Sequence, residues 1–146
     1  MRIMVTGAAG FIGSNYVRRI IDHSLQGISS VIALDSLTYA GVIENLDGVT
    51  SSENFTFVHG DIRDAELVSG LLRDVDAVIN FAAESHVDRS IDDASAFVQT
   101  NVLGTFNVLE ASRKSGVKTM IHVSTDEVYG SLSEGSADEN YPLEPN

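Results

Sequence analysis

The sequence predicts an α/β fold built on a doubly wound parallel sheet. Short apolar runs alternate with segments of helical periodicity, the runs are apolar on both faces, and a glycine-rich turn directly follows the first run. Strands that are buried on both faces belong to parallel sheets that helices cover on each side. We therefore expect a Rossmann domain over residues 1–146, with a sheet that is incomplete at its C-terminal end.

Five runs rich in β-branched and apolar residues are the predicted strands. They span residues 3–6, 31–35, 55–60, 77–83 and 119–125. Residues 36–54 are polar, contain glycine and exceed a tight connection, so we expect a short helix and a loop near a ligand. From Gly130 onward the chain is polar and acidic and ends in a proline-containing segment, which we expect to be a loop and not a domain edge.

Three segments between the predicted strands place their side chains on one helical stripe. The stripes are Tyr16, Val17, Ile20 and Ile21, then Leu67, Val68, Leu71 and Leu72, then Phe97, Asn101, Val102, Thr105, Val108, Leu109 and Ser112. The third stripe belongs to a long helix predicted over residues 94–115. Packing on the sheet explains all three.

Charge and composition exclude several classes of partner. Nine basic residues against 21 acidic ones give a formal charge of −12, which repels the phosphates of nucleic acids and anionic membranes. Without cysteine the chain cannot form disulfides, thiolate metal sites or a thiol nucleophile. No long apolar run or leader precedes the first strand, so we expect a soluble, cytoplasmic protein that begins at its native start and binds neither nucleic acid nor membrane.

A GxxGxxG pattern, Gly7, Gly10 and Gly13, follows the first predicted strand and opens the first helix, with Phe11 and Ile12 inside the turn. Glycine permits a turn that a Cβ would obstruct and lets the backbone approach a pyrophosphate. The free amides and the helix dipole can then hold phosphates without a basic side chain. Spacing alone leaves a tight strand-to-helix turn as the alternative.

Asp35 ends the second predicted strand at the offset of about 20 residues expected for an acid that binds the adenosine ribose hydroxyls. The alternative is a turn or helix cap. Ser36 and Leu37 follow, with no arginine to accept a 2′-phosphate, so the pattern favours NAD over NADP as the cofactor.

The fourth predicted strand leads into a polar cluster. Residues 81–83 leave room for a cofactor to lie over them, and residues 84–89 are expected to emerge into the crevice outside the carboxyl ends of the strands. The alternative is a solvated loop with a surface ion pair between Asp88 and Arg89.

Histidines are not predicted to be catalytic or to bind metal. Ser85 and His86 are adjacent, and adjacent side chains point apart in an extended chain, which disfavours a nucleophile and base pair. We predict no metal site, and we interpret His23, His59 and His122 as packing or surface residues.

Two carboxylic residues, Asp126 and Glu127, follow Thr125 at the end of the fifth predicted strand. Neighbouring carboxyl groups can serve as an acid and a base when their environments drive the two pKa values apart. A capping Asp and a solvated Glu at a turn are the alternative.

Together these residues resemble the extended short-chain dehydrogenase/reductase family and, within it, the dTDP-glucose 4,6-dehydratases. The matching segments are GAAGFIGS at 7–14, LDSLTYAG at 34–41, GDIRD at 60–64, FAAESHVDRSI at 81–91, TNVLGT at 100–105 and STDEVYG at 124–130. GxxGxxG is common to the superfamily, whereas LTYAG, AAESHVDRS and TDEVYG together are much narrower.

The resemblance implies a lyase that dehydrates a nucleotide-activated glucose, dTDP-glucose, to the 4-keto-6-deoxy sugar with NAD as cofactor. Hydride leaves C4 of the hexose, water is eliminated across C5 and C6, and the hydride returns at C6. In this interpretation Thr125 hydrogen-bonds the C4 oxygen, Asp126 protonates the departing C6 hydroxyl, and Glu127 removes the C5 proton.

The resemblance also implies the contacts of the cofactor and the substrate. Ser85 and Thr125 would reach the substrate. The residues implied around NAD are Gly7, Gly10, Phe11, Ile12, Gly13, Asp35, Ser36, Leu37, Thr38, Asp61, Ile62, Phe81, Ala82, Ala83, Ser85 and Thr100. The resemblance also implies a homodimer that uses the helix over residues 94–115, although packing on the sheet explains the stripe of this helix equally well.

The Tyr-x-x-x-Lys pair of the family is absent, because neither Lys114 nor Lys118 lies four residues after a tyrosine. We therefore expect residues 1–146 to be the amino-terminal part of a longer enzyme, without the substrate-binding domain and inactive alone. The alternatives are a sugar-nucleotide 4-epimerase, which needs no acid and base for elimination, and a non-catalytic dinucleotide-binding module.

Overall fold

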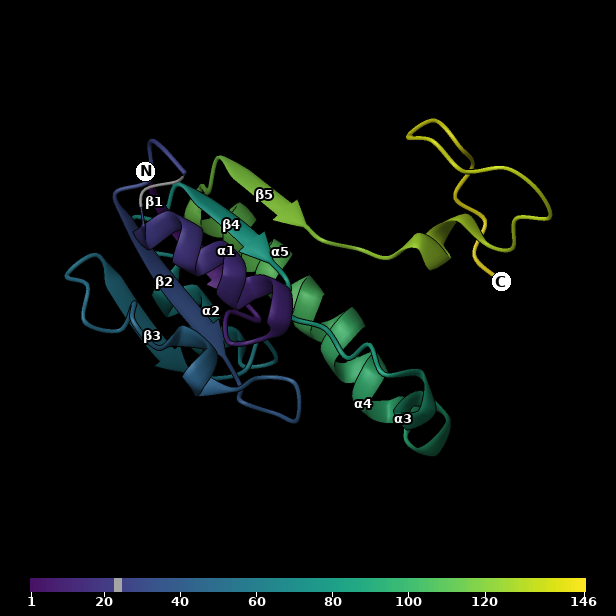
Figure 1. Ribbon diagram of the computed structural model, residues 1–146, viewed down its shortest axis with the longest axis horizontal. Helices are drawn as coiled ribbons and strands as arrows, with labels where there is room; N and C mark the ends of the chain where they lie inside the picture. Colours follow the sequence, from purple (N-terminus) through teal and green to yellow (C-terminus); the bar gives the residue numbers. More distant parts are fainter. Residues whose placement is uncertain (23–24) are drawn as a thin grey trace.

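The computed structural model describes residues 1–22 and 25–146, so His23 lies outside the described residues. Five strands form one parallel sheet in the order β3-β2-β1-β4-β5 (Figure 1). Their bounds are β1 Arg2–Thr6, β2 Ser30–Asp35, β3 Phe55–His59, β4 Ala77–Asn80 and β5 Thr119–His122. The chain builds outward from β1 first on one side and then on the other, which confirms the doubly wound sheet.

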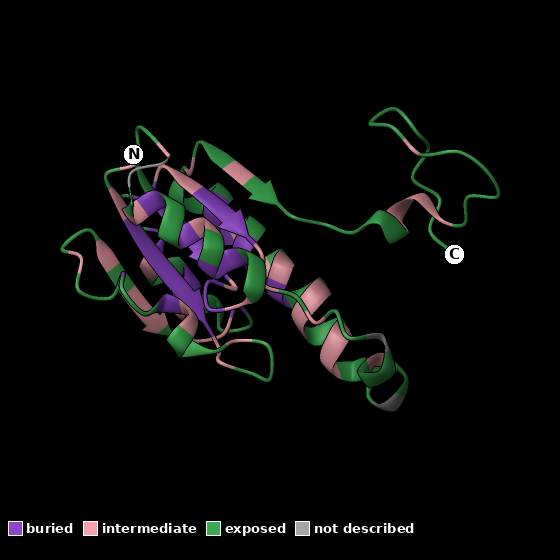
Figure 2. Cartoon of the chain, viewed as in Figure 1, coloured by how far each residue is buried: buried purple, intermediate pink, exposed green. Residues whose placement is uncertain are grey.

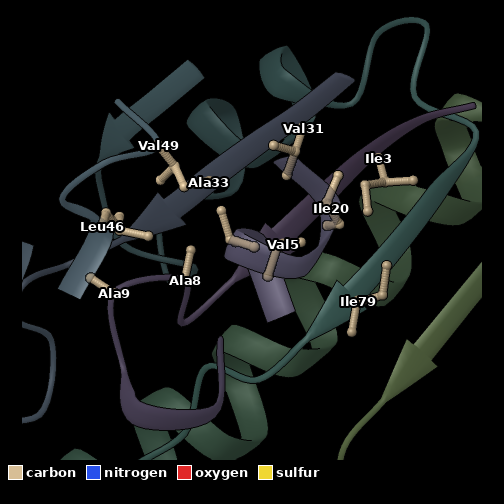
Figure 3. Packing of buried hydrophobic residues seen from close by; sticks show 11 residues of the cluster. Ile3, Val5, Ala8, Ala9, Ile20, Val31, Ala33, Leu46, Val49 and Ile79 are labelled. Carbon is tan, nitrogen blue, oxygen red and sulfur yellow. The ribbon is translucent and has the colours of Figure 1, made fainter. Parts of the chain in front are cut away.

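Helix α1 (Phe11–Ile21) covers one face of the sheet. Its buried Val17 and Ile20 lie in one core cluster with Ile3 and Val5 of β1. Figure 3 shows Ile20 with these two strand residues. Successive side chains of a strand point to opposite faces, so these alternate β1 residues belong to a single face. The apolar stripe predicted for this helix is therefore confirmed.

Helices α2 (Ala65–Leu71) and α5 (Thr105–Ser115) cover the opposite face, behind the sheet in Figure 1. Met4 of β1 points to this face and lies in one core cluster with Val68 of α2 and Val108 of α5. The sheet is thus buried between two helical layers, as its apolar strands predict.

Strands β4 and β5 end earlier than predicted. The amide of Phe81 donates to the carbonyl of Thr6 (3.1 Å), and the amide of Val123 donates to the carbonyl of Asn80 (3.1 Å). Because β1 turns away at Gly7, β4 has no neighbouring strand to pair with beyond this level, and β5 then loses its own partner. The predicted strand residues 81–83 and 123–125 therefore continue as irregular chain.

Side chains also join the three strands at this level. The hydroxyl of Thr6 in β1 donates to the side-chain oxygen of the buried Asn80 in β4. The side-chain nitrogen of Asn80 in turn lies 2.9 Å from Nδ1 of His122 in β5. A continuous polar chain therefore crosses β1, β4 and β5.

The long helix predicted over residues 94–115 has three consecutive parts: α4 (Ala94–Phe97), the wider π-helical η2 (Val98–Gly104), and α5. Val108 is buried, but Val102 and Leu109 are 59% and 50% exposed. Packing on the sheet therefore accounts for only part of this stripe. A π-helical segment changes the angular spacing of side chains, so a stripe drawn with 3.6 residues per turn does not follow one face through it.

Three short helices and a long exposed segment complete the chain. They are η1 (Ile43–Leu46), within the predicted 36–54 connection, α3 (Val87–Asp92) and η3 (Asp126–Tyr129). After β5 the chain leaves the sheet and is mostly exposed (Figures 1 and 2).

Within residues 1–22 and 25–146, no helix has the length and apolarity needed to cross a membrane.

Candidate functional site

A cavity of about 480 Å³ lies outside the carboxyl ends of the strands. The turn after β1, the loops after β2 and β3, the extension of β4, the long helix and the first residues after β5 all contribute to its lining. From the predicted cofactor set, the lining contains Gly7, Gly10, Phe11, Ile12, Gly13, Asp35, Ser36, Thr38, Asp61, Ile62, Phe81, Ala82, Ala83, Ser85 and Thr100. The fold therefore gathers the predicted cofactor residues from five segments of the sequence.

The glycine turn fits only glycine at two of its positions. Gly7 has a φ of +63°, and a Cβ there would lie 2.7 Å from the amide nitrogen of Ala82 and 2.8 Å from the carbonyl carbon of Phe81. A Cβ on Gly13 would overlap the carbonyl oxygen of Gly7. Helix α1 begins after Gly10 without a side-chain cap, so its first amides stay available for an anion at the cavity wall.

Asp35 is 7% exposed and lies at the end of β2, where it faces the glycine turn. One carboxylate oxygen accepts the amide of Ala9 (2.8 Å) and the other accepts the amide of Leu37 (2.8 Å). Asp35 therefore does cap the turn, which is the alternative to ligand binding that its sequence position left open. Each oxygen retains a second lone pair, so capping and ligand binding are compatible at this carboxylate.

Asp61 and Arg63 form a fixed pair after β3. The Asp61 carboxylate accepts the amide of Arg63 (2.8 Å) and two guanidinium bonds (2.9 and 2.7 Å), and Arg63 also donates to the Gln99 side chain (3.2 Å). Partial burial raises the pKa of Asp61, but the hydrogen bonds and charge of Arg63 outweigh it, so the pKa lies below the usual value. Asp61 is held as an ionised acceptor at the cavity.

Asn101 fixes the extension of β4 beside the cavity. Its side-chain oxygen accepts the amide of Glu84 (2.8 Å), and its side-chain nitrogen donates to the carbonyl of Glu84 (2.8 Å). The Asn101 side chain in η2 thus makes the hydrogen bonds that a neighbouring strand would make if the sheet continued beyond β4. Ser85 follows directly and lines the cavity.

Leu37 is the one predicted cofactor residue that does not line the cavity. Its φ is +51°, and its side chain packs against the core cluster beneath α1. The residue contributes its backbone amide to Asp35 instead.

Thr125, Asp126 and Glu127 lie beyond the cavity lining, which reaches Ser124 at this end. All three are exposed, and Thr125 caps the short η3 helix by accepting the amide of Glu127 (3.3 Å). The hydroxyl of Thr125 also lies 3.2 Å from the Asp126 carboxylate. These residues follow the carboxyl end of β5 on a segment that leaves the sheet (Figure 1), and their assigned roles stay predictions.

The cavity is also lined by residues for which the sequence predicts no individual role, among them Glu84 of the 84–89 segment that is expected in the crevice. They are Leu34, Ala40, Gly41, Gly60, Arg63, Glu84, Ala96, Val123 and Ser124. Most are direct neighbours of assigned residues, so position alone could have found them. The carboxylate of Glu84 is the most distinctive, since its Oε2 is buried and accepts no hydrogen bond from the described part of the chain.

The histidines within the described residues make ordinary contacts. Nε2 of His59 lies 3.2 Å from the carbonyl of Ser36, and His122 pairs with Asn80. The ring of His86 lies edge-on to Tyr39. Over the described ranges 1–22 and 25–146, no three His, Asp or Glu side chains gather as a metal site would require.

Comparisons with known proteins agree on one family. A GDP-mannose 4,6 dehydratase family model matches residues 4–146. The chain is 52% identical to the low-salt glycan biosynthesis protein Agl12 of Haloferax volcanii over 99% of its own length, and 51% identical to the dTDP-glucose 4,6-dehydratase of Streptomyces antibioticus over 100%. It spans less than half of these curated relatives, 46% of the first and 44% of the second.

Solved structures give the same result. The dTDP-glucose 4,6-dehydratase DesIV of Streptomyces venezuelae, a structure with NAD bound, superposes with a TM-score of 0.95 at 55% identity, covering 100% of this chain and 46% of that one. Solved sugar-nucleotide 4-epimerases are more distant, at 27 to 35% identity.

Proposed function

The chain belongs to the GDP-mannose 4,6 dehydratase family, and we propose that it is the NAD-binding part of an enzyme that converts dTDP-glucose to its 4-keto-6-deoxy product. The observation that carries this proposal is the shared cavity formed by the glycine turn, Asp35, Asp61 and the segment after β4. We propose further that the substrate-binding domain and the Tyr-x-x-x-Lys pair belong to polypeptide outside residues 1–146. The share of each relative that the chain spans supports this division.

The residues around the cavity fit NAD. A volume of about 480 Å³ is in the range of ligand sites, and a pyrophosphate can be bound by the uncapped amides of α1. Asp35 has lone pairs for ribose hydroxyls. Arg63, the arginine of the lining, is engaged by Asp61, and no arginine follows Asp35 to accept a 2′-phosphate, which supports NAD over NADP.

The chemistry of the proposed reaction needs both a hydride carrier and proton transfers. NAD, when bound, supplies the hydride acceptor for C4 of the hexose and the hydride donor for C6. Thr125 would hydrogen-bond the C4 oxygen and, with Ser85, orient the sugar. Asp126 would protonate the departing C6 hydroxyl, and Glu127 would remove the C5 proton, which the C4 ketone has made acidic.

The surroundings of Asp126 and Glu127 support a role that depends on the rest of the enzyme. Both side chains are exposed, and neither lines the cavity. A second domain that packed against this segment would exclude water from the two carboxyl groups and give each a different environment.

We propose a cytoplasmic homodimer as the working form. The long helix leaves one set of large apolar side chains exposed, which supports a protein contact there: Val98, Val102, Leu103, Phe106 and Leu109. The negative charge of the chain disfavours nucleic acid and anionic membranes as partners. A nucleotide sugar is the proposed ligand because the chain resembles dTDP-glucose 4,6-dehydratases.

A sugar-nucleotide 4-epimerase and a dinucleotide-binding module without catalysis are the rivals. The epimerase would share the oxidation at C4 but would not need Asp126 and Glu127. The lower identity of the solved epimerases favours the dehydratase.

One experiment separates the three functions. The full-length protein is incubated with dTDP-glucose and NAD and scanned for the alkaline absorbance of a 4-keto sugar. We expect this product from the wild type and none from the Asp126→Asn, Glu127→Gln variant, with NAD affinity unchanged. Product from the variant would refute the two assigned roles, a C4 epimer would indicate the epimerase, and NAD binding without turnover would indicate the module.

A further inference from the structure

Two loops on opposite walls of the cavity touch each other through their side chains. The guanidinium carbon of Arg89 in α3 lies 4.2 Å from the ring centroid of Tyr39, in the loop after β2. The ring of His86 meets the same tyrosine edge-on, with centroids 6.2 Å apart. Arg89 thus contacts an aromatic face. Across the described residues, no ion pair joins it to Asp88, so the surface pair considered from the sequence is not formed.

The loop that carries Tyr39 is fixed at both ends. At its start the amide of Leu37 donates to Asp35, and the amide of Gly41 donates to the carbonyl of Thr38 (3.1 Å) to close a turn. At its end the amide of Val42 donates to the carbonyl of Ala9 in the glycine turn (3.1 Å). Tyr39 therefore stands at the tip of an anchored turn.

The segment that carries Arg89 is anchored before α3 and capped locally after it. Before α3, the backbone of Glu84 is held by Asn101. After α3, the Asp93 carboxylate caps α4 by accepting the amide (3.0 Å) and the hydroxyl (2.6 Å) of Ser95. Helix α3 lies between these two contacts and, like α4, away from the sheet (Figure 1). Its Arg89 contacts Tyr39.

The contact lies on the solvent side of the cavity. Thr38 and Ala40, on either side of Tyr39, line one wall, and Ser85, next to His86, lines the other. Tyr39 is 43% exposed, and His86 and Arg89 are exposed too. A side-chain contact that joins both walls from outside must open before a large ligand passes between them.

We propose that Tyr39, Arg89 and His86 form a clasp that slows the exchange of a bound dinucleotide. The inference rests on the proposed NAD binding. Retention suits a reaction in which the hydride removed at C4 is returned at C6, because the cofactor then ends each cycle in its starting form and need not leave.

The clasp makes a specific kinetic prediction. An exposed cation–π contact is weak, so its loss should raise the rate of dinucleotide dissociation by only about 2- to 5-fold. The same contact must open for entry, so the association rate should rise by a similar factor and Kd should stay within about 2-fold. A side chain that binds the ligand directly would raise Kd instead.

The test uses the full-length protein loaded with NADH and chased with excess NAD in a stopped-flow fluorimeter. Tyr39→Ala and Arg89→Ala should each accelerate exchange, the double variant should exchange no faster than either single variant, and Tyr39→Phe should behave as wild type because it keeps the ring. Arg73→Ala, which removes an exposed arginine outside the cavity lining, is the matched control. Arg89→Gln serves as a second variant with a smaller loss of packing.

The outcomes separate this inference from the proposed function. A wild type that binds no NADH would overturn the proposed function and the clasp together. A wild type that binds NADH, with unchanged rates in all Tyr39 and Arg89 variants, would overturn the clasp alone. Additive effects with a raised Kd would also overturn it, since they would show two independent contacts to the ligand.

Discussion

The two ends of the predicted site differ in how their residues are held. At the ends of β1 and β2, backbone groups and one buried carboxylate fix one another, as in the bonds from Ala9 and Leu37 to Asp35. At the end of β5, Thr125, Asp126 and Glu127 are exposed and bonded to close neighbours in the chain. The first end is held by contacts between distant residues within 1–146, whereas the residues of the second end are exposed to solvent. Four substitutions test this contrast, and their expected effects on stability run from large to small.

Gly7→Ala should produce the largest effect, because it acts on the organised end. A Cβ at Gly7 would meet the backbone of Phe81 and Ala82 within 2.9 Å, and the φ of +63° adds strain. We expect the free energy of unfolding to fall by about 3–5 kcal/mol in urea denaturation.

Gly70→Ala is the matched control, since Gly70 lies inside α2, and a Cβ added there would have no heavy atom within 4 Å. It should gain about 0.5–1 kcal/mol from helix propensity. Equal losses of unfolding free energy in the two variants would show that the close backbone approach at Gly7 does not determine stability.

Asn101→Ala should have an intermediate effect, because it frees the chain segment beyond β4. It removes two hydrogen bonds of 2.8 Å to the backbone of Glu84. We expect a loss of about 1–3 kcal/mol in unfolding free energy and faster amide exchange at Glu84. Asn101→Asp keeps the acceptor and should lose less. An alanine variant as stable as the wild type would contradict the anchoring role.

Arg63→Met should change the pH dependence of stability. Asp61 has a lowered pKa in the folded protein, so its ionisation contributes stability above its unfolded pKa of about 3.9 that is lost as pH falls through the folded value. Without Arg63, the drop in unfolding free energy between about pH 6 and pH 3 should be smaller by up to about 1 kcal/mol, since the pair is partly exposed. Arg73→Met, with the same change of charge, should leave that contribution in place. If the unfolding free energy of Arg63→Met fell as much as that of the wild type over this pH range, the claim that Arg63 lowers the pKa of Asp61 would be contradicted.

The Asp126→Asn, Glu127→Gln variant should have the smallest effect on stability. Both residues are exposed and contact their neighbours in the chain, so we expect an unfolding free energy within about 0.5 kcal/mol of the wild type and an unchanged far-ultraviolet spectrum. A loss of more than about 1 kcal/mol would show that these carboxyl groups support the fold and that the contrast between the two ends is incorrect.

The sequence predicted those features that follow from local residue types. Glycine spacing and an acid after the second apolar run located the turn and Asp35, because both depend on a few consecutive residues. The apolar runs located all five strands, but not the ends of β4 and β5, since the run through Phe81 stays apolar after its partner strand has turned away at Gly7. Strand ends depend on the neighbouring strand.

Contacts between distant residues could not be predicted in this way. Asn101 was assigned to an apolar stripe, and its bonds to Glu84 depend on the π-helical turn that rotates it toward the β4 extension. Leu37 was assigned to the cofactor, but its positive φ turns the side chain into the core. The clasp of Tyr39 and Arg89 joins residues 50 positions apart, with no pattern in either segment to relate them.

The chain of polar side chains from Thr6 through Asn80 to His122 has a consequence for alignment. Parallel strands can in principle slip past one another, and a slip of one residue would turn every side chain of a strand to the opposite face. The apolar rows of β1 and β4 resist this only by packing, whereas Thr6, Asn80 and His122 match at a single register. These three side chains therefore fix the register of β1, β4 and β5 relative to one another. As a result, the position at which β5 ends, before Thr125, is fixed relative to the position at which β1 ends, before the glycine turn.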